Sequence, residues 1–219
     1  MINARRSATA PASLATGTDW RAPDVLRQLH ADFYGKCYLT EAPVTEAGFE
    51  VDHRHPRTVG GPTLDWGNLY PAEKGANGRR KKSWPAGGLL HPDGRDDVES
   101  RLDQEAILEP TDILCLFQAK DPSDTAAVNT AQELYDLHHD DQDPDAPNKA
   151  RDLRRAIQHQ LTLVLEKATV VLDLRYTRPP EDPERRKQER IFQRMVSRRS
   201  PYTMLVRSRV HPKLRDLFD

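Results

Sequence analysis

The stretch from Phe49 to Pro85 constrains the fold more than any other part of the chain. A short apolar and charged run ends in Asp52-His53, and a loop with two prolines and two glycines follows at positions 56 to 62. Such residues end a strand and leave no room for a long element. We therefore expect three short elements here: a strand at 49–53, a second strand near 69–70 and a helix over 73–82.

Four polar residues in this stretch form one candidate site. Asp52 and His53 are adjacent, Asn68 lies fifteen residues after His53, and Asn77 lies nine residues after Asn68. Hydrolysis of a phosphodiester needs a base for the attacking water and positive charge near the phosphate. An imidazole titrates near neutral pH, so His53 is the candidate base. Asp52 and Asn77 offer the hard oxygen ligands that Mg²⁺ accepts.

A basic run and the geometry of the strand complete this interpretation. Neighbouring side chains of a regular strand point to opposite faces, so Asp52 and His53 can serve one phosphate only where the strand ends. The turn residues that follow favour such an ending. A run of four basic residues after Asn77 is a candidate for holding backbone phosphates. The run consists of Arg79, Arg80, Lys81 and Lys82.

The Asp-His pair, the Asn-Leu pair and the later Asn, at these spacings, resemble the HNH (ββα-metal) endonucleases. The resemblance implies an α+β fold with a ββα-metal core and a mainly helical C-terminal elaboration. It also implies a metal-dependent nuclease. His53 and Asn68 would belong to the catalytic set, and Asp52 and Asn77 would hold Mg²⁺ or Mn²⁺.

Many HNH proteins also hold a structural zinc through two Cys-x-x-Cys pairs. The corresponding positions here are Cys37 with Thr40, and Glu73 with Ala76. Three of the four ligands are absent, and a closed tetrahedral site cannot be formed from what remains. We therefore expect no structural zinc, and we interpret Cys37 as a small buried apolar residue.

A narrower resemblance, to the HNH nuclease subunit of Septu-type antiphage systems, covers most of the chain after the first twenty or so residues. It depends on DWGNLYPAEKGANGRRKKSWP, on GLLHPDGRDD and on Ser200-Pro201-Tyr202. It implies an antiviral defence complex in which an ABC/SMC-like ATPase licenses cleavage. This chain has no Gly-x-x-x-x-Gly-Lys-Ser/Thr motif, so ATP binding would come from the partner.

Composition and charge agree with a soluble protein that meets charged partners. Hydrophobic residues make up 37% and charged residues 31% of the 219. No apolar run approaches the ~20 residues of a membrane span, the N-terminus lacks a secretory signal, and two distant cysteines favour the reducing cytoplasm. Residues 1–92 carry a net charge of +3, residues 93–145 of −13 and residues 149–219 of +9. These blocks are compatible with a nucleic-acid groove and a separate partner surface.

The pattern predicts three segments. Residues 1–20 are rich in Ala, Ser and Thr and predict a mobile arm, residues 21–92 form the nuclease core, and residues 93–219 dock a partner or buttress the core. His138-His139-Asp140-Asp141 opens an Asp/Pro-rich loop with no matching ligand cluster, so we interpret it as a loop and not as a metal site. Periodicity and turn signals predict further elements at 22–34, 106–108, 113–117, 126–137, 146–176 and 184–199.

The sequence leaves three functions open. The first is a metal-dependent DNase in a defence complex. The second is an RNase of the same fold, with tRNA as a plausible target, because an HNH core grips the backbone and does not exclude RNA. The third is a non-catalytic nucleic-acid-binding or scaffold module with a vestigial core, and the intact set of four polar residues argues against it.

Overall fold

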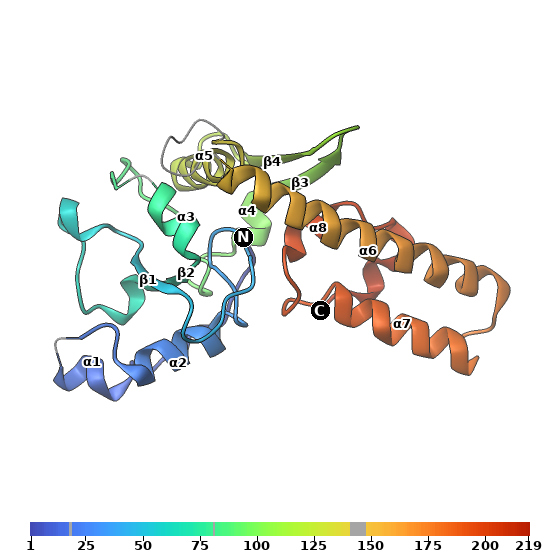
Figure 1. Cartoon of the computed structure of the whole chain (residues 1–219), viewed down its shortest axis with the longest axis horizontal. Helices are drawn as coiled ribbons and strands as arrows, with labels where there is room; N and C mark the ends of the chain where they lie inside the picture. The colour runs from blue at the N-terminus through green and yellow to red at the C-terminus, as the bar shows by residue number, and fades with distance from the viewer. Residues whose placement is uncertain (18, 81, 141–147) are drawn as a thin grey trace.

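The computed structural model describes residues 1–17, 19–80, 82–140 and 148–219. These residues form helices and two small antiparallel sheets, which is consistent with the predicted α+β class (Figure 1). In chain order the elements are α1 (Ala12–Thr16), α2 (Pro23–Asp32), β1 (Glu50–His53), η1 (Arg57–Val59), η2 (Trp66–Asn68), β2 (Leu69–Ala72), α3 (Lys74–Arg79), α4 (Val98–Arg101), β3 (Leu102–Leu108), β4 (Ile113–Ala119), α5 (Thr125–His139), α6 (Lys149–Thr177), α7 (Pro183–Met195), α8 (Thr203–Ser208) and η3 (Pro212–Leu217).

The first sheet is a two-stranded ribbon that carries the predicted site. β1 and β2 are antiparallel, with Glu50 opposite Ala72 and His53 opposite Leu69. The amide of Arg54 still donates to the carbonyl of Asn68 at 3.0 Å, and there the two chains separate into the loop. Both short strands of the 49–85 stretch are therefore confirmed, and β1 ends at the predicted histidine.

The helix after β2 is confirmed and is shorter than predicted. The carboxylate of Glu73 caps α3, because its two oxygens accept from the amides of Gly75 (2.8 Å) and Ala76 (2.7 Å). This cap fixes where the helix begins. The helix ends at Arg79, after Gly78, which has a low helix propensity.

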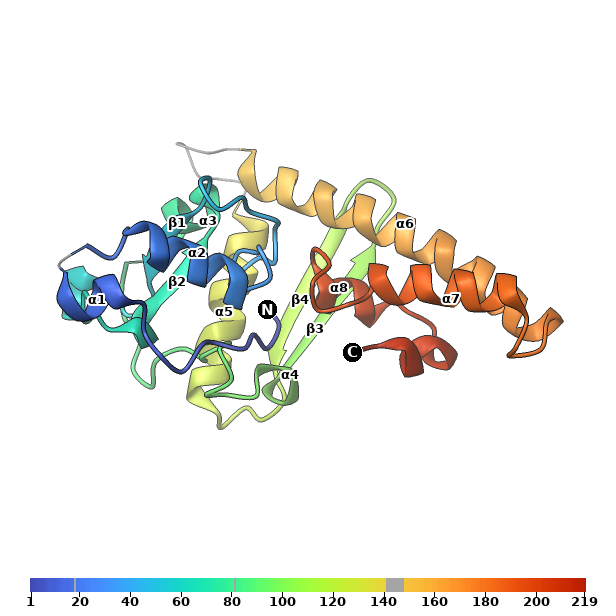
Figure 2. The same cartoon turned by 90° about the horizontal axis from the view of Figure 1, so that it is seen from below.

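The rest of the chain is a hairpin covered by helices. β3 and β4 pair antiparallel from Leu102 opposite Ala119 to Leu108 opposite Ile113. The observed hairpin is longer than the predicted one at the start of β3 and at the end of β4. α5 begins where Asp124 caps the amide of Ala127. α6 and α7 run side by side in opposite directions in both views (Figures 1 and 2). These five elements confirm the predicted hairpin and helices.

Two hydrophobic clusters lie at the centre of the packing. The first runs from the N-terminal residues to Leu137 and includes Val98, Leu102 and Leu134. The second joins α6, α7 and α8 to the far half of the hairpin. The predicted division after residue 92 differs from this packing, because α4, α5 and the near half of the hairpin complete the core beneath the ββα element. A truncation after Pro92 would open the first cluster.

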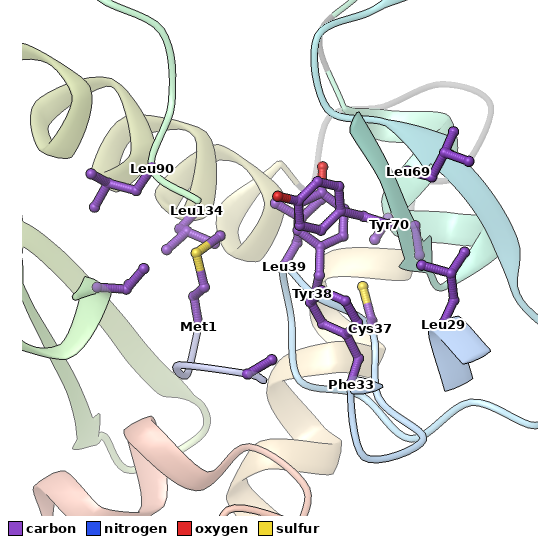
Figure 3. Close-up of a cluster of buried hydrophobic side chains, with 14 of the residues drawn as sticks. Met1, Leu29, Phe33, Cys37, Tyr38, Leu39, Leu69, Tyr70, Leu90 and Leu134 are labelled. Carbon is purple, nitrogen blue, oxygen red and sulfur yellow. The ribbon is translucent and has the colours of Figure 1, made fainter. Parts of the chain in front are cut away.

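The N-terminal segment differs from the predicted mobile arm at residues 1–20. Met1 is buried, and its side chain reaches toward Leu134 of α5 (Figure 3). Arg6 donates to the carbonyl of Trp66 at 2.6 Å, and its guanidinium lies 4.5 Å from the ring centre of Tyr70. A composition rich in Ala, Ser and Thr conceals these few anchors, so the described residues 1–17 belong to the packed structure.

Candidate active site

One cleft gathers most of the predicted catalytic residues. It is open to solvent and has a volume of about 530 Å³. Asp52 and His53 enter it from the end of β1, and Asn77 enters it from α3. Asn68 does not line it. The remaining lining residues are Trp20, Arg21, Val51, Pro56, Arg57, Thr58 and Lys82.

The ring of His53 is held in one orientation. Its Nε2 lies 3.0 Å from the carbonyl oxygen of Thr63, so Nε2 carries the proton and Nδ1 keeps its lone pair. Trp20 packs edge-on against the ring, with 5.2 Å between ring centres. Burial lowers the pKa of His53 and the charges of Arg57 and Arg21 lower it further, against the opposing effects of the Thr63 contact and Asp52. The imidazole is therefore neutral near pH 7, as a general base requires.

The carboxylate of Asp52 is buried and anchored on one side. Its Oδ2 accepts hydrogen bonds from the hydroxyl of Tyr38 and from Nη1 of Arg80, both at 2.6 Å. None of the described residues donates to its Oδ1. Because Asp52 also lines the cleft, Oδ1 is the carboxylate oxygen that remains for a ligand there.

The amide of Asn77 is oriented by two charged neighbours. Its Nδ2 donates to Oε2 of Glu50 at 2.7 Å, and its Oδ1 accepts from Nζ of Lys82 at 3.1 Å. Glu50 lies on the same strand as Asp52, two residues earlier. The hydrogen bond from the amide nitrogen to the Glu50 carboxylate leaves the amide oxygen facing the Lys82 ammonium.

The side-chain oxygens of Asp52 and Asn77 are of the hard type that a divalent cation accepts. Mg²⁺ typically takes one or two protein oxygens and keeps water or substrate phosphate in its other positions. Oδ1 of Asp52 and Oδ1 of Asn77 supply such a pair from two different elements, and the Lys82 ammonium is the group that a cation at Asn77 would displace. Among the described residues, those of this cleft included, no group of three or more His, Cys, Asp or Glu side chains is placed to hold a metal ion.

Asn68, predicted to belong to the catalytic set, lies in the loop between β1 and β2 and outside the lining of the cleft. It is buried, its Oδ1 accepts from the amide of His55 (2.8 Å), and its Nδ2 donates to the carbonyls of His55 (3.0 Å) and Pro62 (2.8 Å). The side chain therefore closes the loop between β1 and β2 upon itself. Asn68 positions the loop that presents Thr63 to His53 and does not reach the cleft.

The described members of the basic run make different contacts. They do not form the single phosphate-binding group that was predicted for the run. Arg79 donates to the carbonyls of Gly75 and Leu137. Arg80 is buried against Asp52. Lys81 lies outside the described residues. Lys82 is exposed and is the one described member of the run that lines the cleft.

Three cleft residues were missed in the sequence. Trp20 and Arg21 stand just before α2, and Arg57 opens η1 in the loop after β1. Arg57 lies in the turn-rich loop next to the predicted base, so its place in the cleft had a local signal. Trp20 and Arg21 had none, because only the tertiary fold brings them to His53.

The positions of the lost zinc pairs are filled by packing. Cys37, Thr40 and Ala76 are all buried. Burial raises the pKa of the Cys37 thiol, against smaller effects of hydrogen bonds from Thr40 and from the backbone of Glu73. A zinc ligand must be a thiolate, so this environment disfavours the ligand form. The absence of a structural zinc stays a prediction that elemental analysis can test.

The pair His138-His139 ends α5 and is not arranged as a metal site. His138 is buried, its Nδ1 lies 2.7 Å from the carbonyl of Leu134, and its ring packs on Phe117. His139 makes the equivalent contact with Tyr135. Asp141 and the rest of the predicted Asp/Pro-rich loop lie outside the described residues.

Comparisons with family models, with curated proteins and with solved structures found no match to this chain. Among the described helices, none combines the length and the apolar character needed to cross a membrane.

Proposed function

We propose that this protein is a metal-dependent endonuclease of the HNH type, which hydrolyses phosphodiester bonds of DNA. The observation that carries the proposal is the cleft at the end of β1. There a neutral, oriented imidazole meets two oxygen ligands from β1 and α3. This combination supplies a base and a place for a divalent cation within one open cleft.

Each residue has a distinct task in the proposed reaction. His53 removes the proton of the attacking water at Nδ1, while its Nε2–H remains bound to Thr63. Asp52 and Asn77 would hold a divalent cation, which would supply positive charge at the scissile phosphate and the leaving oxygen. Arg80 and Tyr38 fix the carboxylate of Asp52, and Asn68 fixes the loop.

The test uses the full chain with plasmid DNA, single-stranded DNA and total RNA, each with Mg²⁺, with Mn²⁺ and with excess chelator. We expect cleavage that chelation stops, and a loss of about 10²–10⁴-fold in His53→Ala and His53→Gln. His159→Ala is the matched control, because this histidine is exposed on α6. Unfolding curves establish that each variant is folded.

Binding of Mn²⁺, followed by electron paramagnetic resonance, keeps the test decisive if the isolated chain is silent. We expect Asp52→Asn to weaken binding, since an amide replaces a charged ligand. A wild-type chain that neither cleaves nor binds Mn²⁺ would refute the proposal. Cleavage of RNA alone would instead favour the RNase of the same fold.

Control by a partner ATPase in an antiviral complex remains part of the proposal. It depends on the Septu-type resemblance and on the acidic block between residues 93 and 145, which can steer a basic protein surface. Co-purification of the full chain with the neighbouring gene product tests it. Failure to co-purify would remove the partner and leave the nuclease proposal intact.

A further inference from the structure

Trp20 organises one wall of the cleft. Its ring meets His53 edge-on, with an interplanar angle of 79°. The guanidinium of Arg57 lies 4.4 Å from the ring centre, and that of Arg21 lies 5.8 Å away. One indole, supplied from a segment some thirty residues upstream of β1, thus holds two cations beside the candidate base.

Both guanidinium groups keep their donors available. Arg21 and Arg57 are exposed, and in the ranges that the structure describes neither side chain makes a hydrogen bond or an ion pair. The arginines on the inner side of the site are engaged instead. Arg80 binds Asp52, and Arg54 binds the carbonyl of Leu89 and the ring of His91.

The two arginines are also fixed at their backbones. Arg57 begins η1 within the loop that Asn68 closes. The amide of Arg21 donates to Oδ1 of Asp19 at 2.8 Å, directly before α2. A guanidinium that is stacked on an aromatic face loses little freedom when its planar fork meets a phosphate. The wall is therefore arranged to receive anionic oxygens.

We propose that Arg57 and Arg21, aligned on Trp20, form a clamp for the nucleic-acid backbone next to the scissile phosphate. The inference rests on the proposed function and names the substrate contact of the same cleft. The contact is to phosphate, so it acts on all sequences alike. It replaces the contact predicted for the run from Arg79 to Lys82, of which only Lys82 faces the cleft among the described members.

The experiment measures binding apart from cleavage. Fluorescence anisotropy follows labelled duplex DNA, single-stranded DNA and RNA with the full chain in excess chelator, over a salt series from about 50 to about 300 mM. The variants are Arg57→Gln, Arg57→Lys and Trp20→Leu. Arg190→Gln is the matched control, because Arg190 is an exposed arginine on α7 outside the cleft.

We expect Arg57→Gln to weaken binding about five- to ten-fold near 0.1 M salt and to reduce the slope of log K against log salt by about one. Arg57→Lys keeps the charge and should retain the slope, with lower affinity because the stacked fork is lost. Trp20→Leu should lower affinity with the charge unchanged. The control should bind like the wild type.

Two outcomes would overturn the clamp. One is a wild-type chain that binds none of the three nucleic acids. The other is an Arg57→Gln variant whose affinity and slope equal those of Arg190→Gln. A changed slope in a chain that neither cleaves nor binds Mn²⁺ would support the clamp and refute the nuclease proposal, so the two failures are distinguishable.

Discussion

Replacement of Arg80 by methionine should destabilise the whole ββα element. The side chain of Arg80 is 1% exposed and has four partners. Nη1 donates to Oδ2 of Asp52 (2.6 Å) and to the carbonyl of His53 (3.1 Å), and Nη2 donates to the carbonyl of Arg54. Its Nε lies 3.4 Å from Oε1 of Glu133 on α5. Methionine fills a similar volume and removes every donor.

The magnitude follows from the buried ion pair. Removing one partner of a buried pair typically costs ~3–5 kcal/mol, because the other charge stays buried without compensation. Tyr38 still donates to Asp52, which limits the loss at the carboxylate. The two carbonyls that lose their donor cost about 1 kcal/mol or more each where water does not reach them. We therefore expect a total loss of about 3–5 kcal/mol.

Urea denaturation and thermal unfolding of the full chain check this value. For a chain of this size, ~1 kcal/mol lowers Tm by ~2–4 °C, so Tm should fall by about 6–20 °C. Lys82→Met is the control. It removes a positive charge from the same basic run, but Lys82 is exposed, so a change within about 1 kcal/mol is expected. Equal shifts in the two variants would refute a structural role specific to Arg80.

Two further predictions concern the loop and α5. Asn68→Ala removes three hydrogen bonds within the loop and should lower the free energy of unfolding by about 2–4 kcal/mol. Amide hydrogen exchange at residues 54–66 should become faster, and unchanged exchange would contradict the role of Asn68 in closing the loop. Burial lowers the pKa of His138 to about 3. Between about pH 6.5 and about pH 3, the imidazole therefore takes up a proton only in the unfolded state. The free energy of unfolding falls as the pH drops through that window. From about pH 7 to about pH 4.5, wild type should lose about 2–3 kcal/mol more than His138→Leu, measured by urea titrations; parallel profiles would show that His138 does not titrate this way.

The elements of the site could be predicted because their signals are local. The turn residues after His53 end β1, and the carboxylate of Glu73 caps the helix that carries Asn77. The side chains of Asp52, His53 and Asn77 then reach one cleft, as the spacing predicted. The nuclease activity attached to that cleft stays a proposal.

The division of the basic run has a local signal in the helical phase of α3. Arg80 follows Ala76 by four residues, so both project from the same face of α3 or its continuation. Ala76 is fully buried, and the face that carries it points toward the core. Helical phase therefore predicts an inward Arg80, whereas a run of four basic residues taken as one unit predicts a solvated face.

The long-range contacts had no local signal. Trp20 reaches His53 across the loop, and Met1 reaches Leu134 across more than half of the chain. Neither contact is encoded in the spacing of nearby residues, because each depends on how separate elements pack. The predicted mobile arm failed for the same reason, since its composition is that of a free segment and its few apolar residues find partners only in the folded core.

The geometry of the strand end explains how neighbouring residues can serve one phosphate. Asp52 and His53 point to opposite faces of β1, toward Arg80 and toward Trp20 respectively. The cleft lies around the end of the strand, so it reaches both faces. Arg80 binds Asp52, His53 and Arg54 at once and thereby fixes the backbone at this ending. The residue predicted to bind substrate instead sets the relative positions of the candidate base and the candidate metal ligand.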